Sequence, residues 1–116
     1  MKFLSTLLCF VVFYSGGIAQ DTWYTQTSGT TAPLTDICFI NQDTGWISGW
    51  TGTILHTTNG GATWTDQGAP STNAYFSVFF IDAQNGWACG YAGRVIHTSD
   101  GGLNWTIQTT PTEDDL

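Results

Sequence analysis

The sequence has almost no positive charge. Lys2 and Arg94 are the only lysine and arginine among 116 residues, against nine Asp and Glu, and the formal net charge is −7 at pH 7. Proteins that bind nucleic acid neutralise phosphates with clustered cations, and proteins that bind anionic lipids need the same kind of patch. The composition therefore excludes nucleic acid and anionic membrane surfaces as partners.

Charge of either sign is scarce, whereas aromatic residues and glycine are abundant. Charged residues make up 9% of the chain and aromatics 15%, and there are 14 glycines. This balance is typical of an all-β protein and argues against a disordered one. No stretch outside the N-terminal segment has helical periodicity, and the length suits a single domain.

The N-terminal segment has the plan of a secretory signal peptide. Met1 and Lys2 precede an apolar run from Phe3 to Tyr14, and small residues follow, with Gly17 and Ala19 at the positions that a signal peptidase reads. The run of roughly 12 residues is shorter than the ~20 that span a bilayer. We predict a signal peptide over 1–19 and a secreted, periplasmic or extracellular mature chain without membrane attachment. A buried strand or a short anchor is the alternative.

The mature region repeats every 41 residues. Trp23, Trp64 and Trp105 are spaced by 41 and each begins a Trp-x-x-Gln sequence. Residues 45–65 align without gaps on residues 86–106, with ten of 21 positions identical. The register defines repeat units over about 34–74 and 75–115, and an additional outer strand over 22–26 precedes them.

In each unit, turn sequences separate four short predicted strands. Asn-Gly and Asp-Gly between apolar alternations are hairpin signals. Four strands in a repeat of about 40 residues are typical of a β-propeller blade. A solenoid with four strands per turn is the alternative. The predicted strands are 36–40, 46–48, 53–57 and 62–66 in the first unit and 76–81, 87–89, 94–98 and 103–107 in the second.

Two units and one outer strand make an incomplete propeller. Leu34, Tyr75 and Leu116 are 41 apart, so the sequence stops at the first residue of a third unit. Propellers commonly have 4–8 blades, and repeat arrays need about three units for stability. We expect an N-terminal fragment of a longer secreted propeller. The alternative, if the chain is complete, is a small subunit that closes a ring by self-association.

The turn sequences carry a family resemblance. Residues 57–64 and 98–105 look like the Asp-box (BNR) motif Ser/Thr-x-Asp-x-Gly-x-Thr-Trp, and the longer Gly-Trp…Asp-Gly-Gly-x-x-Trp pattern resembles the repeats of photosystem II stability/assembly factors. The resemblance implies a β-propeller that acts as a scaffold or binding module. It also implies partner contact through an arginine-rich patch, and only Arg94 is present here. The resemblance therefore does not predict a photosystem partner for this chain.

The Asp-box residues are interpreted as structural. Asn59 stands in place of the motif's Asp in the first box, and Asn104 in place of its Thr in the second. A short polar side chain that binds backbone amides closes the hairpin, glycine supplies a positive φ, and tryptophan packs beneath. The structural set is Thr57, Asn59, Gly61, Trp64, Thr98, Asp100, Gly102 and Trp105.

Trp50 and Tyr91 are the candidate binding residues. They occupy equivalent Gly-x-x-Gly turns between the second and third strands. Exposed aromatic rings at turn tips can stack on sugars or contact a protein partner. The alternative is packing into a neighbouring blade.

Cysteine and histidine give weaker signals. Cys38 and Cys89 remain after export into an oxidising compartment and can form a disulfide if their strands meet. His56 and His97 are equivalent positions in successive units, and neither has a neighbour at metal-ligand spacing. We predict no metal and no cofactor, and assign both histidines to packing between blades.

Catalysis is not favoured, with an Asp-box glycoside hydrolase as the alternative. Sialidase chemistry needs an arginine cluster that one Arg cannot build. A xyloglucanase-like reaction needs two facing carboxylates. Asp36, at the start of an innermost strand, is the one candidate, and its counterpart Ser77 is not acidic.

Overall fold

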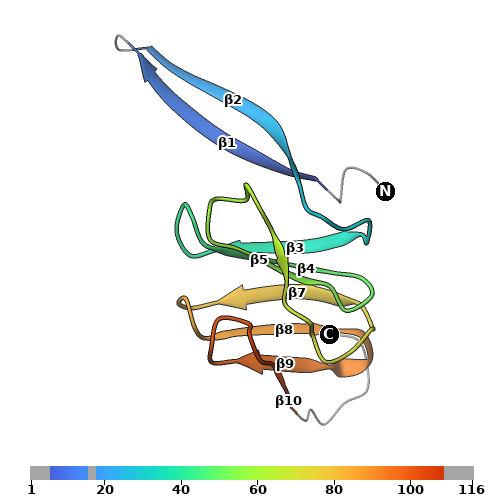
Figure 1. The fold of residues 1–116 in the computed structure, drawn as a ribbon. Helices are drawn as coiled ribbons and strands as arrows, with labels where there is room; N and C mark the ends of the chain where they lie inside the picture. Colours follow the sequence, from blue (N-terminus) through green and yellow to red (C-terminus); the bar gives the residue numbers. More distant parts are fainter. Residues whose placement is uncertain (1–5, 16–17, 109–116) are drawn as a thin grey trace.

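The computed structural model describes residues 6–15 and 18–108 and consists almost entirely of antiparallel β-strands (Figure 1). One two-stranded sheet precedes two four-stranded sheets. Within the described part of the chain, no helix is both long and apolar enough to cross a membrane.

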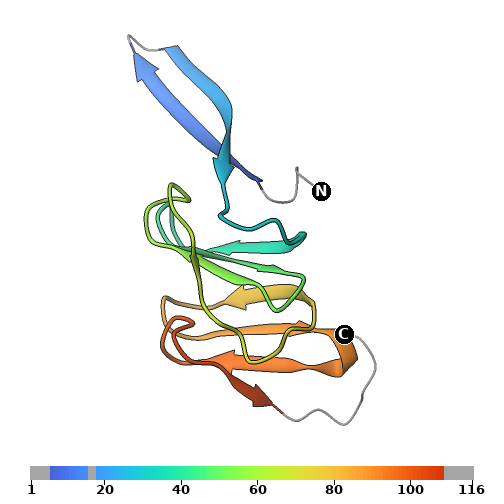
Figure 2. The same ribbon diagram turned by 45° about the vertical axis from the view of Figure 1, so that its right-hand side comes forward.

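Each four-stranded sheet is one sequence repeat, with its strands side by side in chain order. The two sheets are called blade 1 and blade 2, and they stack face to face (Figures 1 and 2). The chain is thus an incomplete β-propeller of two blades, as predicted. Blade 1 contains β3 (Leu34–Phe39), β4 (Gly45–Gly49), β5 (Ile54–Thr57) and β6 (Thr65–Asp66). Blade 2 contains β7 (Tyr75–Phe80), β8 (Gly86–Gly90), β9 (Val95–Thr98) and β10 (Thr106–Gln108).

The outer strands are shorter than the sequence predicts. The strands expected over 62–66 and 103–107 are reduced to β6 and β10. Residues 58–64 and 99–105 instead form the Asp-box turns, whose side chains bind the local backbone and hold it out of the ladder. The end of the second predicted unit, 109–115, and Leu116 lie outside the described residues.

A hairpin lies beyond blade 1. It pairs β1 (Thr6–Ser15) with β2 (Ile18–Thr27), so that Phe10 stands opposite Trp23. β2 contains the predicted outer strand 22–26, and β1 falls in the predicted signal peptide. The peptidase position Gly17 lies outside the described residues. Pairing in the uncleaved chain does not test cleavage, so the signal peptide stays a prediction.

The hydrophobic core lies between the two blades. Because neighbouring strand residues point to opposite faces, Trp46 and Ile54 face blade 2 while Ile47 and Leu55 face the other way. Blade 2 contributes the larger part of the core. The buried members of the cluster are Trp46, Ile54, Tyr75, Val78, Phe80, Ala88 and Ile96.

Trp46 is the central contact of that core. Its indole ring is fully buried and lies between His56, at 4.8 Å and 13°, and Phe80 of blade 2, at 3.5 Å and 4° between ring planes. Its Nε1 donates a hydrogen bond of 2.9 Å to the carbonyl of Gly101 in the second Asp-box turn. One side chain thus joins the second strand of one blade to the turn of the next.

The glycine before this tryptophan is required by close packing. A Cβ at Gly45 would lie 2.7 Å from the ring of Phe39, which stands opposite it in the ladder. At Gly86 a Cβ would lie 2.5 Å from the ring of Phe80. The repeated Gly-Trp dipeptide therefore leaves room for an aromatic ring beside it and supplies one itself.

The recurring Trp-x-x-Gln sequence also has a structural role. Gln26 Nε2 donates to the Gly60 carbonyl over 3.2 Å, and a Cβ on Gly61 would collide with the Gln26 amide. Gln67 lies in the same way against Gly102, where a Cβ would be 3.1 Å from its Oε1. Each glutamine thus reaches the Asp-box turn of the following unit.

We expect Trp46→Phe to lower the free energy of unfolding by about 1–3 kcal/mol, because the buried carbonyl of Gly101 loses its donor. Trp87→Phe is the matched control. Trp87 is the equivalent residue of blade 2, is only half-buried, and contacts His97. We expect the control to change stability by less than about 0.5 kcal/mol. Urea denaturation of dilute protein measures both, and equal losses contradict this account.

Candidate binding surface

The aromatic turns have a left-handed backbone. In the turn Trp50–Thr53, Thr51 has φ 54° and Gly52 has φ 73°. Thr53 N donates to the Trp50 carbonyl over 3.1 Å. Two central residues with positive φ indicate a type I′ hairpin turn. The equivalent turn begins at Tyr91, with Ala92 at φ 59° and Gly93 at φ 66°.

Backbone hydrogen bonds tie both turns to the segments that enter the innermost strands. Trp50 N donates to the Pro33 carbonyl over 2.9 Å, and Tyr91 N donates to the Ala74 carbonyl over 3.0 Å. Gly52 N also donates to Asn73 in the segment that connects the blades, over 3.0 Å. The two aromatic residues therefore stand on fixed backbone.

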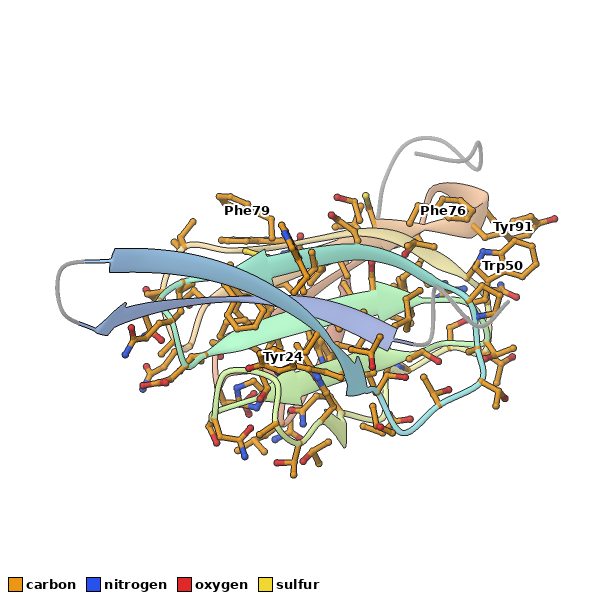
Figure 3. All side chains as sticks on the ribbon, turned by 90° about the horizontal axis from the view of Figure 1, so that it is seen from above. Tyr24, Trp50, Phe76, Phe79 and Tyr91 are labelled. Atoms are coloured by element: carbon orange, nitrogen blue, oxygen red, sulfur yellow. The ribbon has the colours of Figure 1, made fainter. Side chains whose placement is uncertain are left out.

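The side chains of these two residues remain exposed. Trp50 and Tyr91 are each 53% exposed. Figure 3, which looks down the stack, shows both rings at the same end of the blades, where Phe76 also lies. Trp50 keeps this exposure although blade 2 packs against blade 1. We name Trp50, Phe76 and Tyr91 the aromatic end.

The only described cation follows one of these turns. Arg94 comes directly after Gly93 and is half-buried, and within the described residues its Nε has no hydrogen-bond partner. The fully buried Tyr75 lies close enough to be affected by this charge. Burial raises the pKa of Tyr75, and the positive charge of Arg94 partly offsets that rise.

The Asp-box turns lie at the opposite end of the blades, because β5 and β9 run back from the aromatic turns. In the first box, Thr57 Oγ1 donates to Asn59 Oδ1 over 2.9 Å and accepts from Gly61 N over 2.9 Å. Asn59 Oδ1 also accepts from Thr63 N over 2.9 Å. Trp64 contacts Phe39 edge-on, at 6.0 Å between ring centroids.

The second box has the same closed arrangement with a charged centre. Asp100 accepts from the Asn104 side chain and backbone, both over 2.9 Å, and from Thr98 Oγ1 over 2.8 Å. Gly102 N donates to Thr98 Oγ1 over 2.9 Å, and Trp105 contacts Phe80 edge-on at 6.0 Å. These bonds, led by the Asn104 side chain, lower the pKa of Asp100 to about 2.

The disulfide between Cys38 and Cys89 is not formed, and both thiols are free. Cys38 lies on the blade 1 face that blade 2 covers, and its Sγ accepts from Phe80 N over 3.4 Å. Cys89 follows the buried Ala88 and points to the other face of β8. Cys38 faces blade 2, whereas Cys89 lies on the face of blade 2 that points away from blade 1, so the two thiols do not meet. Burial raises the pKa of the Cys89 thiol, and the charge of Asp36 adds to the rise.

The histidines and Asp36 are engaged with their neighbours. His56 stacks on Trp46, and burial lowers its pKa, while His97 packs at 4.8 Å from Trp87. Asp36 Oδ2 accepts from Ser77 Oγ over 2.9 Å and from Val78 N over 3.1 Å, so it links β3 to β7. Across the described ranges, no three His, Cys, Asp or Glu residues gather closely enough to hold a metal ion.

Comparison with known proteins identifies the family. The family model described as photosynthesis system II assembly factor YCF48 matches residues 17–113. The chain belongs to the YCF48 family. No curated protein matches it.

Solved YCF48 structures have the same blades. The structure described as YCF48 bound to D1 peptide is 32% identical, with a TM-score of 0.64, over 72% of this chain and 29% of that one. YCF48 from Cyanidioschyzon merolae is also 32% identical, with a TM-score of 0.59, over 71% of this chain and 26% of that one. The chain thus spans less than a third of either relative.

Sequence reasoning missed the contacts that join the blades of this YCF48-family chain. It assigned no role to Gln26 or Gln67 and did not identify Trp46 as a donor to the next unit. The signal was present, because both residue types recur at the 41-residue spacing. Periodicity alone does not tell which side chains reach across to the neighbouring blade.

We expect Asp100 to titrate at about pH 2 in the folded chain, below its ordinary 3.8. Because the folded pKa is the lower one, Asp100 contributes stability above pH 3.8 that is lost as the pH falls towards 2. Carboxyl carbon NMR measures this pKa. Asn104→Ala removes the largest cause and should raise it, whereas Asn73→Ala, in the blade connector, should leave it unchanged. An Asp100 pKa of 3.8 in the unaltered chain contradicts the assignment.

Proposed function

We propose that the chain is part of an exported propeller of the YCF48 family that binds a segment of a partner protein at its aromatic end. The observation that carries the proposal is the pair of half-exposed rings, Trp50 and Tyr91, on turns fixed by backbone hydrogen bonds. Aromatic side chains on rigid backbone supply contact area at low entropic cost, which is why they dominate binding hot spots.

Membership of the YCF48 family supports a polypeptide partner. One solved relative is described as bound to a D1 peptide. That description concerns the relative, and this chain covers 29% of it. The inference drawn for this chain is the class of partner, an extended protein segment, and not its identity.

Charge narrows the chemistry of that segment. The chain carries a net charge of −7, so it attracts cationic partners at long range. Lysine or arginine side chains can also lie over the faces of Trp50 and Tyr91 in cation–π contacts. We therefore propose a segment that combines basic and apolar residues.

The contacts of Asp36 favour binding over hydrolysis. Its carboxylate is occupied by Ser77 and Val78, and the facing position in blade 2 holds a hydroxyl instead of a second carboxylate. Glycoside hydrolysis uses two carboxyl groups across a cleft. The family match favours the binding interpretation as well.

The proposal of export is supported by the N-terminal sequence, in which a charged start precedes an apolar run. The family match begins at residue 17, so the charged start and the apolar run lie outside it. A segment of this kind outside the family match is expected of a signal peptide that is cleaved off, and not of a strand of the propeller.

Binding is tested with an array of random 12-residue peptides probed with the purified chain. The peptides that bind are then titrated in solution against Trp50→Ala and Tyr91→Ala. We expect each substitution to weaken binding at least about tenfold, as for a truncated hot-spot aromatic.

Leu103→Ala is the matched control, because Leu103 is 74% exposed at the opposite end of the blade. Its affinity should equal that of the unaltered chain. Unchanged binding by both aromatic variants would place the site elsewhere. Signals on a glycan array in place of the peptide array would replace the protein partner with a sugar.

Export is tested by expressing the full chain with a C-terminal tag in a secreting bacterium and sequencing the N-terminus of the exported protein. We expect the mature chain to begin at Gln20. Retention inside the cell with Met1 intact contradicts export.

A further inference from the structure

The aromatic turns of the two blades are both hydrogen-bonded to one short segment, the connector between the blades. Gly52 N, in the turn of Trp50, donates to the Asn73 carbonyl over 3.0 Å. Tyr91 N donates to the carbonyl of the next residue, Ala74, also over 3.0 Å. The two acceptors belong to neighbouring residues, whose Cα atoms are about 3.8 Å apart. The separation of the two turns is therefore set by backbone contacts within the chain.

Two glycines bring the connector into close contact with these turns. A Cβ on Gly52 would collide with the carbonyl of Ser71, and a Cβ on Gly90 would collide with the carbonyl of Ala74. Both collisions would be with backbone, which cannot rotate away as a flexible side chain does. The connector thus supports the turn of blade 1 and the turn of blade 2 together.

The two exposed rings are separated along the stack of blades and much less across it. Figure 3 looks down the stack, and in that view the rings of Trp50 and Tyr91 lie over nearly the same place. Figure 1 shows the stack from the side, with blade 2 as the layer after blade 1. Packed sheets are about 10 Å apart, so the two rings stand about that far from each other.

This spacing selects among the conformations of a bound segment. In a β-strand, the side chains on one face repeat every two residues, at about 6.8 Å, and the next one lies at about 13.6 Å. In a polyproline II helix, the side chains on one face repeat every three residues, at about 9.3 Å. Of these two extended conformations, polyproline II places successive side chains of one face over both rings.

An α-helix covers the same distance in about seven residues, but it binds in an apolar groove. The rings here stand on exposed turns, and the connector that joins these turns is polar over Ser71, Thr72 and Asn73. The surface at the aromatic end therefore favours a narrow extended segment over a helix.

Exposed aromatic rings are also the surface on which proline-rich segments pack. A polyproline II segment is already in its bound conformation, so it loses little entropy when it binds. Trp50 and Tyr91, each 53% exposed, offer such rings. The net charge of −7 favours basic residues beside the prolines.

We propose that Trp50 and Tyr91 bind one polyproline II segment of the partner as a pair, each ring receiving one proline, with the two prolines three residues apart. The inference rests on the proposed binding role of the aromatic end. It adds the conformation of the bound segment and the spacing that the two blades read.

Three synthetic 12-residue peptides of identical composition test the spacing. Each has an arginine at both ends, three prolines and seven serines, and the prolines recur every second, every third or every fourth residue. Fluorescence anisotropy of labelled peptides, titrated with the purified chain, gives their affinities. We expect the peptide with a spacing of three to bind at least about tenfold more tightly than the other two, because it alone engages both rings.

The two ring variants test the pairing. Trp50→Ala and Tyr91→Ala should each abolish the preference among the three peptides, because a single ring cannot discriminate a spacing. Leu103→Ala, altered at the opposite end of the blade, should keep the preference. Circular dichroism of each variant checks that its blades are folded.

Equal affinity for the three peptides, or a preference that survives in both ring variants, overturns the paired contact. The proposed function stands in those cases if peptides from the random array still lose affinity in Trp50→Ala and Tyr91→Ala. Array peptides that lack proline and yet depend on both rings also overturn the polyproline II assignment alone. Ring variants that leave the binding of every array peptide unchanged overturn both.

Discussion

The structure depends on the position of one indole ring. Trp46 fills the space between His56 of its own blade and Phe80 of the next, and its nitrogen satisfies a carbonyl of the second Asp-box turn. Ile54, Val78, Ala88 and Ile96 are buried around this contact, between the two sheets. Isolated four-stranded sheets of this length expose too much apolar surface to be stable alone.

This single contact accounts for several features of the repeat that otherwise look unrelated. The Gly-Trp dipeptide makes room for a ring and provides one, the histidine closes one side of the stack, and the Asp-box glycine presents the acceptor carbonyl. Their common spacing places Trp46 of blade 1 opposite the Asp-box turn of blade 2, to which it donates. The Trp-x-x-Gln sequence adds a second contact to the same turn through its glutamine.

The stacking also determines what the molecule can offer to partners. Because both blades have the same orientation, their Gly-x-x-Gly turns lie at one end of the blades, and Trp50 and Tyr91 both lie at that end. The Asp-box turns occupy the other end, where their polar side chains are used internally. Binding and structural roles are thus separated along the strands.

Much of the fold could be predicted from sequence, because turn chemistry and strand alternation are local. The Asn-Gly and Asp-Gly turns located the third and fourth strands of each blade, and the 41-residue period located the blades. The contacts between blades are long-range, and a single sequence does not give them. The face on which Cys89 lies and the acceptor of Trp46 depend on how two sheets pack. For the same reason, the turn sequence suggests that Trp50 is exposed, but only the packing of blade 2 against blade 1 establishes it.

A double-mutant cycle on Trp46 and Phe80 tests the central role of this contact most directly. The stability of the chain with Trp46→Leu, with Phe80→Leu and with both substitutions gives their coupling free energy by urea denaturation. The account predicts a coupling of about 1 kcal/mol or more, because residues in direct contact are not additive. Additive losses, with a coupling near zero, would show that the two blades are not held together by this ring.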